Sequence, residues 1–270
     1  MLPGTPLFFR AGRAPLRNIY IFFSVISAIR CTLTLSTPHG TGKETHDMNL
    51  RHEWKHEISP ADLTVLRQRL RAAARPDGHG RDGVYQIRSL YFDTPEDRVL
   101  REKLDGLDRR EKFRIRCYDG NYSCIRLEKK SKINGLCGKE SAPLTAGEVR
   151  GLLAGERAWM TGSGRNLVWE LCSKMTAQRL GPKTIVDYTR EAFVFAPGNV
   201  RVTLDYGIRT GLGCTDFLDP CCVTVPIRDA PIILEVKWDA FLPDVIREAV
   251  QLGNRRAASF SKYAACRRYG

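Results

Sequence analysis

Residues 112–132, KFRIRCYDGNYSCIRLEKKSK, alternate charged and apolar side chains along two segments joined by a tight turn. Lys112, Arg114 and Arg116 share one face of the first segment, because successive side chains of a strand point to opposite sides. Charged residues at alternate positions from 126 to 132 do the same in the second segment. The DGN turn between them suits a hairpin. The stretch therefore predicts two antiparallel strands, each with one apolar and one charged face.

The same period of two recurs elsewhere in the chain, most strictly over residues 50–58. Further strands are expected at 84–92, 136–141, 184–195, 200–206 and 232–239. Helices are expected at 60–75, 97–104, 145–154, 166–179, 243–252 and 259–268. Amphipathic helices can cover the apolar faces of the strands, so the chain is expected to fold as an α+β protein.

The composition is that of a globular protein with a large excess of positive charge. Of 270 residues, 43% are hydrophobic and 27% are charged, which excludes a fibrous or wholly disordered chain. The net charge of +13 indicates a polyanionic partner: nucleic acid, an acidic membrane surface or a phosphate chain. The nine cysteines are an odd number without a C-x-x-C pair, so we expect reduced thiols and a cytoplasmic protein.

The first 47 residues differ in character from the rest. Their apolar run, residues 19–29, is too short to span a bilayer, and a polar stretch rich in Gly, Pro and Thr follows it. We expect residues 1–47 to be a disordered leader or the result of a start assigned too early, with Met48 as the natural start. Residues 48–270 then form the folded domain.

The charged strand faces are mostly Arg and Lys, which calls for a counter-charge. One carboxylate recurs on each of three faces, at Glu53, Glu128 and Glu235. If the sheet closes, these faces line a narrow interior in which the cations repel one another unless a polyanion lies among them. The three glutamates are then candidate ligands for a hard divalent metal that bridges to phosphate oxygens.

Seven short segments in this order resemble the VTC polyphosphate polymerase domain, a branch of the triphosphate tunnel metalloenzyme (CYTH-like) superfamily. They are Arg51–Lys55, Ile87–Thr94, Arg114–Arg116, Leu127–Lys130, Val200–Asp205, Leu234–Lys237 and Ser261–Tyr263. The resemblance spans about residues 49 to 268. It implies a closed antiparallel tunnel of about eight strands with helices packed outside. It also implies a transfer of phosphoryl groups from ATP to a growing polyphosphate chain, assisted by Mn²⁺ or Mg²⁺.

By position, the resemblance implies roles for the charged residues of these segments. Five would act in catalysis: Lys55, Arg114, Arg116, Lys130 and Lys262. Three would bind phosphate: Arg190, Arg201 and Lys237. Glu235 would be the metal ligand, with Glu128 and Glu53 as further candidates. The expected ligands are ATP and inorganic polyphosphate. Nucleic acid is not expected, because few aromatic residues accompany the basic faces, and a membrane-protein partner stays open.

Two departures from the hydrolytic branch bear on the activity. Its opening signature is E-x-E-x-K, and Arg51 stands here in place of the first glutamate. Lys237 follows Glu235 where hydrolytic relatives tend to carry a second acid. Both changes replace metal ligands by bases, which favours holding a long polyanion over activating water. A tripolyphosphate or nucleoside triphosphate hydrolase and a non-catalytic polyphosphate-binding module remain the alternatives.

Two other motifs are set aside. His52 to His56 match H-E-x-x-H, but that zinc motif needs a helix and the alternation here predicts a strand. The segment Gly40 to Lys43 is similar to a phosphate loop but lacks its first glycine and a preceding strand. Asp205 is equally consistent with a metal ligand and with the partner of an arginine.

Overall fold

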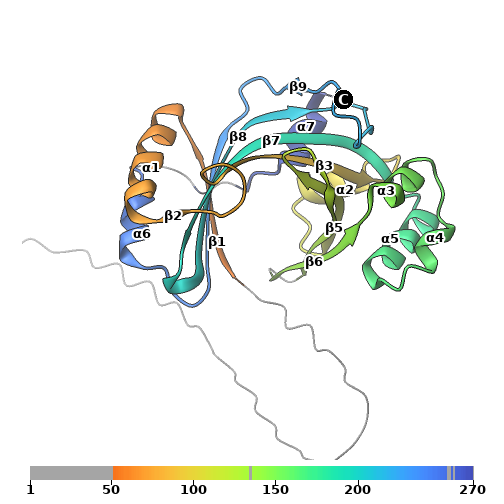
Figure 1. Ribbon diagram of the computed structural model, residues 1–270, viewed down its shortest axis with the longest axis horizontal. Coiled ribbons are helices and arrows are strands. Elements are labelled where there is room, and N and C mark those ends of the chain that lie inside the picture. Colours follow the sequence, from red (N-terminus) through yellow and green to blue (C-terminus); the bar gives the residue numbers. More distant parts are fainter. Residues whose placement is uncertain (1–50, 134–135, 254–256, 258, 270) are drawn as a thin grey trace, which may run out of the picture. The chain divides into compact units, whose positions relative to one another are not determined.

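The computed structural model describes residues 51–133, 136–253, 257 and 259–269. The expected leader, residues 1–47, and the expected start at Met48 lie outside the described residues. Figure 1 shows one long curled sheet with helices packed against it. The protein is therefore of the α+β class, as the alternating segments predict.

All pairings of the sheet are antiparallel, and eight strands form its continuous path. In spatial order these are β1 (His52–Ile58), β10 (Ile232–Trp238), β8 (Val200–Thr210), β7 (Gly181–Phe195), β3 (Val84–Asp93), β4 (Arg110–Tyr118), β5 (Asn121–Ile133) and β6 (Leu136–Leu144). Two short strands lie off this path: β2 (Arg75–Pro76) pairs with β7, and β9 (Val225–Pro226) pairs with β8. Residues 112–132 form most of the β4–β5 hairpin, which lies between β3 and β6 in the sheet.

The barrel is open, so the expectation of a closed tunnel is wrong. The path of the sheet ends at β1 and at β6, and no pairing joins these two strands among the residues that the structure describes. The free edge of β1 is met at His56 by Ala257, which forms an isolated antiparallel bridge with it. Ala257 thus lies at the edge of β1 with which β6 would have to pair for closure.

Seven helices are found in the described part of the chain. They are α1 (Pro60–Ala73), α2 (Arg98–Leu104), α3 (Ala146–Leu153), α4 (Ala158–Thr161), α5 (Asn166–Ala177), α6 (Asp244–Ala249) and α7 (Lys262–Cys266). The first helix begins where the sequence predicts it. The Ser59 hydroxyl accepts a hydrogen bond from the Asp62 backbone N–H, and the Asp62 carboxylate accepts one from the Ser59 N–H.

The apolar faces of the strands turn outward and pack under the helices. Phe113 and Leu127 are fully buried in one cluster with Leu171 of α5. At the other end of the sheet, Leu66 of α1 packs with Val202 in a second cluster. This arrangement turns the charged faces of the strands toward the inside of the curl. No helix of the described residues has both the length and the hydropathy to cross a membrane.

Candidate functional site

The concave side of the sheet encloses a cavity of 1330 Å³. It is lined by side chains from β1, β3, β4, β5, β6, β7, β8 and β10, and by the segment around α7. The predicted site residues that line it are Glu53, Lys55, Arg114, Arg116, Lys130, Arg190, Arg201, Glu235, Lys237 and Lys262. The remaining predicted residue, Glu128, is buried, and its carboxylate forms an ion pair with Arg114, which lines the cavity. Segments far apart in the sequence are thus brought to one place.

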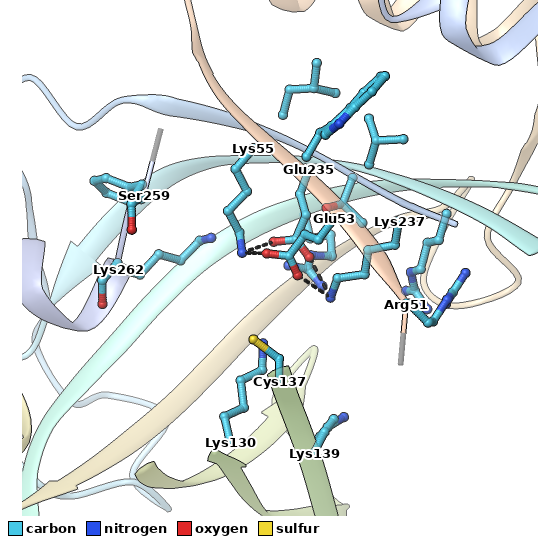
Figure 2. A pocket seen from close by; sticks show the side chains of 18 of the residues that line it. Arg51, Glu53, Lys55, Lys130, Cys137, Lys139, Glu235, Lys237, Ser259 and Lys262 are labelled. Carbon is cyan, nitrogen blue, oxygen red and sulfur yellow. Dashed lines mark hydrogen bonds and ion pairs between the residues drawn. The ribbon is translucent and has the colours of Figure 1, made fainter. Parts of the chain in front are cut away.

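The densest group of charges lies between β1 and β10. In the register of these strands Lys55 lies opposite Glu235, and Glu53 lies opposite Lys237. The Lys237 Nζ is 2.7 Å from one Glu235 carboxyl oxygen, and the Lys55 Nζ is 3.4 Å from the other. Glu53 forms ion pairs with both lysines, and Figure 2 shows the two carboxylates and two ammonium groups meeting at one point.

The electrostatic balance of this group keeps Glu235 ionised. Burial would raise the pKa of Glu235, but the cations around it, Lys237 and Lys55 foremost, lower it more, so that it lies well below its usual value. Burial lowers the pKa of Lys55, and Glu235 opposes that effect. This group of two glutamates and two lysines therefore presents carboxylate oxygens to a cation and ammonium groups to an anion.

A second group lies across the cavity, on the β4–β5 hairpin. Arg114 is buried, and its guanidinium bonds the Glu128 carboxylate at 2.6 and 2.8 Å and the Tyr91 hydroxyl at 2.9 Å. Lys139 of β6 lies 2.6 Å from the other Glu128 oxygen. Although burial would raise it, the pKa of Glu128 lies far below its usual value because Arg114, Arg116 and Lys139 lower it more. Glu128 therefore orients arginines.

Arg116 is held one step along the same strand. Its Nε donates to the Ser89 hydroxyl at 3.1 Å and its Nη2 to the Tyr188 hydroxyl at 3.0 Å. Both partners are neutral, and the nearest Glu128 oxygen is 3.8 Å from the guanidinium. Most of the positive charge of Arg116 is therefore available to an anion in the cavity.

A third group joins β7, β8 and α7. Arg190 binds both oxygens of Asp205, at 2.7 and 2.8 Å, and the Lys262 Nζ lies 2.7 Å from one of them. Burial would raise the pKa of Asp205, but Arg190 and Lys262 lower it to about 2. The sequence left open whether Asp205 binds a metal or an arginine, and the structure shows it as the partner of Arg190.

Arg201 lies further along β8. Its guanidinium is 2.5 Å from the Asp77 carboxylate and 2.8 Å from the Tyr85 hydroxyl. Asp77 belongs to the loop after β2 and is buried. A loop carboxylate thus fixes the direction of this cation.

The carboxylates that could hold a divalent metal are Glu53 and Glu235. The described residues contain no cluster of three or more His, Cys, Asp or Glu side chains with the geometry of a metal site. Two carboxylates on neighbouring strands are nevertheless enough for Mg²⁺ or Mn²⁺, which take further ligands from water and from substrate phosphates. Glu128 is on β5 rather than on β1 or β10, and it pairs with Arg114 and Lys139.

Sequence reasoning missed several residues of the site. Lys112 lines the cavity and shares its strand face with Arg114 and Arg116, so the alternation could have included it. Tyr91 and Tyr188 also line the cavity. Burial would raise the pKa of Tyr91, but the cations beside it, Arg114 foremost, lower it to about 8. Nothing in the sequence of β3 or β7 shows which of their aromatic residues face inward.

The structure also shows the backbone conformation of the H-E-x-x-H segment, His52 to His56. His52 and His56 lie in strand β1, so they do not meet one helical turn apart. His52 is exposed and stacks on Trp238, with ring centroids 5.4 Å apart. The expectation of a strand here is confirmed.

Comparisons with known proteins give one family and several distant structural neighbours. A crystal structure of a proposed adenylate cyclase from Bacillus halodurans is similar with a TM-score of 0.43 and 13% identity, over 70% of this chain and 80% of that chain. The PH1819 protein of Pyrococcus horikoshii has a TM-score of 0.43 and 12% identity, over 81% of this chain and 96% of its own. No match was found among curated protein sequences. The VTC domain model matches residues 50–269 of the 270-residue chain, and the protein therefore belongs to the VTC domain family.

Proposed function

We propose that this protein is a metal-dependent phosphotransferase that synthesises inorganic polyphosphate from ATP. One observation carries the proposal: Arg and Lys side chains from seven different strands converge on one cavity, in which Glu53 and Glu235 of neighbouring strands are the candidate ligands for a metal. Such a site suits a ligand with many negative oxygens in a row. The ligands would be ATP and a polyphosphate chain rather than nucleic acid, and the activity would be cytoplasmic, where ATP is available.

Phosphoryl transfer asks mainly for alignment and for neutralisation of charge on the phosphate oxygens. Arg114 and Arg116 present their guanidinium groups from one wall, held by Glu128 and by the Ser89 and Tyr188 hydroxyls. Arg190 of β7 presents a third guanidinium group, which is held by Asp205. Because these groups are fixed before the substrate arrives, they bind phosphate oxygens with little loss of conformational entropy.

The lysines supply compact charges between these walls. Lys55 and Lys237 lie beside Glu235, and Lys262 reaches in from α7. The terminal phosphate of the acceptor chain is itself a nucleophile, so no protein side chain has to attack. A Mn²⁺ or Mg²⁺ bound by Glu235 and Glu53 would supply further positive charge to the transferring phosphoryl group.

The hydrolase alternative finds less support in the geometry. Arg51, at the position of the first glutamate of the hydrolytic signature, is bound to Asp239, 2.7 Å away. Lys237, where a second acid would lie, is bound to Glu235. Neither position offers a carboxylate that could help to activate water.

One assay separates the polymerase from its alternatives. The full chain is incubated with ATP and Mn²⁺, and both the released orthophosphate and the length of the phosphate products are followed. We expect polymer. Orthophosphate alone would indicate a hydrolase, and tight binding of polyphosphate without turnover would indicate a binding module.

A further inference from the structure

Two lysines of the cavity differ from all its other described cations. Lys112 and Lys130 have no hydrogen bond and no ion pair to any residue that the structure describes, although both line the cavity. Most of the other cavity cations named in the site are matched by acids: Lys55 and Lys237 by Glu235, Arg114 by Glu128, Arg190 and Lys262 by Asp205, and Arg201 by Asp77. Arg116 is instead hydrogen-bonded to the Ser89 and Tyr188 hydroxyls.

The two lysines are also direct neighbours. In the β4–β5 register Lys112 lies opposite Lys130, and both side chains project from the concave face of the hairpin. Like charges directly opposite each other on two strands destabilise a sheet. Figure 2 shows Lys130 extending from β5 into the space below the Glu53–Glu235 group. The fold therefore places two amines opposite each other at the wall of a cavity. Burial, Arg114 and Lys237 lower the pKa of Lys130 well below its usual value, and Glu235 opposes this.

The groups around Lys112 do not relieve this repulsion. Arg114 of its own strand, Lys103 of α2 and Lys55 of β1 all add positive charge. Tyr91 of β3 also faces Lys112, and it can become negative. Together, burial and these cations lower the pKa of Lys112 to about 8, with burial as the largest cause. An anion placed between the two lysines would remove the repulsion.

We propose that Lys112 and Lys130 form the subsite that receives one phosphoryl group of the bound phosphate chain, and that filling this subsite draws a proton from solvent onto the Lys112 amine. The inference rests on the proposed function, because it names a position for the same class of ligand. No bond is made or broken in the ligand: the proton comes from water or buffer and ends on Nζ of Lys112.

The neighbours of Lys112 determine whether anion binding adds a proton to its amine or removes one. In the empty cavity the Lys112 amine is about half protonated near pH 8, since that is where its pKa lies. A phosphate oxygen beside it favours the ammonium form and raises its pKa. Binding near pH 8 therefore takes up protons, and binding strengthens as the pH falls toward 7.

The experiment is calorimetric titration of the full chain with inorganic tripolyphosphate at pH 8, in two buffers of different ionisation enthalpy. The difference in heat gives the number of protons taken up per anion bound. Lys112→Met is compared with wild type and with the control Lys132→Met. Lys132 lines the same cavity one step along β5, but its Nζ lies 3.5 Å from the Asp108 carboxylate. The protonation state of the free ligand is the same in all three titrations.

We expect wild type and Lys132→Met to take up roughly half a proton more than Lys112→Met. We also expect Lys112→Met to bind about tenfold more weakly. The melting temperature of Lys112→Met without anion should not fall, because the substitution removes a repulsion, and this separates a lost subsite from a lost fold. Equal proton uptake in Lys112→Met and wild type would overturn the inference.

The proposed function can fail separately. If wild type binds tripolyphosphate with the expected uptake but makes no polymer from ATP, the subsite stands and the polymerase does not. If wild type does not bind tripolyphosphate, both are wrong.

Discussion

Arg190 and Asp205 lie opposite each other on β7 and β8, and both oxygens of the buried carboxylate accept hydrogen bonds from the guanidinium, at 2.7 and 2.8 Å. Lys262 of α7 shares one of these oxygens. Two parallel N–H···O bonds fix the plane of a guanidinium as well as its position. The carboxylate therefore both orients a cavity cation and ties α7 to the sheet.

Substitution of Asp205 by Asn should cost stability. It leaves Arg190 and Lys262 without their counter-charge, so we expect the free energy of unfolding to fall by roughly 3 kcal/mol, as measured by denaturant titration. Tripolyphosphate should restore part of this loss, because the anion replaces the missing charge. Asp244→Asn is the control, since the Asp244–Arg247 pair is exposed and should contribute less than about 0.5 kcal/mol. Equal losses in the two variants would contradict the role given to Asp205.

The same carboxylate predicts a dependence of stability on pH. Its pKa in the folded protein is lowered from 3.8 to about 2. A depressed carboxyl pKa stabilises the fold at pH values above the unfolded pKa, and this contribution is lost as the pH falls through the folded pKa. We expect wild type to lose about 2 kcal/mol between roughly pH 4 and pH 2 from this group. In Asp205→Asn this decrease in the free energy of unfolding between pH 4 and pH 2 should be absent. If the variant shows the same decrease, other acids cause it.

Replacement of Arg114 by Lys should separate charge from geometry. Lysine keeps the positive charge but lacks the planar guanidinium, with which Arg114 bonds Glu128 through Nε and Nη2 and Tyr91 through Nη1. We expect polymer formation at saturating ATP to fall about tenfold or more while the chain stays folded. Arg126→Lys on the same hairpin is the control, because Arg126 is exposed and lies outside the cavity lining. Full activity in Arg114→Lys would show that its fixed geometry is not needed.

Glu235 should be needed for turnover and not for binding. Glu235→Gln removes a candidate metal ligand, and we expect the rate of polymer formation to fall by about 100-fold or more. Affinity for tripolyphosphate should be unchanged or somewhat tighter, because a negative charge has left the cavity. Removal of divalent metal with a chelator should lower the rate of polymer formation by wild type in the same way. Glu140→Gln is the matched control, since Glu140 is exposed and pairs with Lys129. Normal turnover in Glu235→Gln would remove this residue from the mechanism.

Much of the site could be identified from local patterns. The charged faces of the β4–β5 hairpin and of β1 follow from a period of two, and ten of the eleven residues selected on the sequence line the cavity, Glu128 being the exception. What each residue contacts could not be predicted in this way. Asp205 lies between Arg190 and Lys262, which are 15 and 57 positions away in the chain. Such partners depend on strand order and register, which no single segment contains.

The amino-acid sequence by itself determined the elements, because alternation, turn residues and helix caps act over a few neighbouring positions. Only the tertiary structure decided that the barrel stays open, since Ala257 rather than β6 meets β1 at His56. It also decided that Glu128 forms an ion pair with Arg114, while Glu53 and Glu235 both form ion pairs with Lys237. Ion pairs in a cavity depend on which distant segments meet there, and their strength depends on how much water the assembled walls exclude.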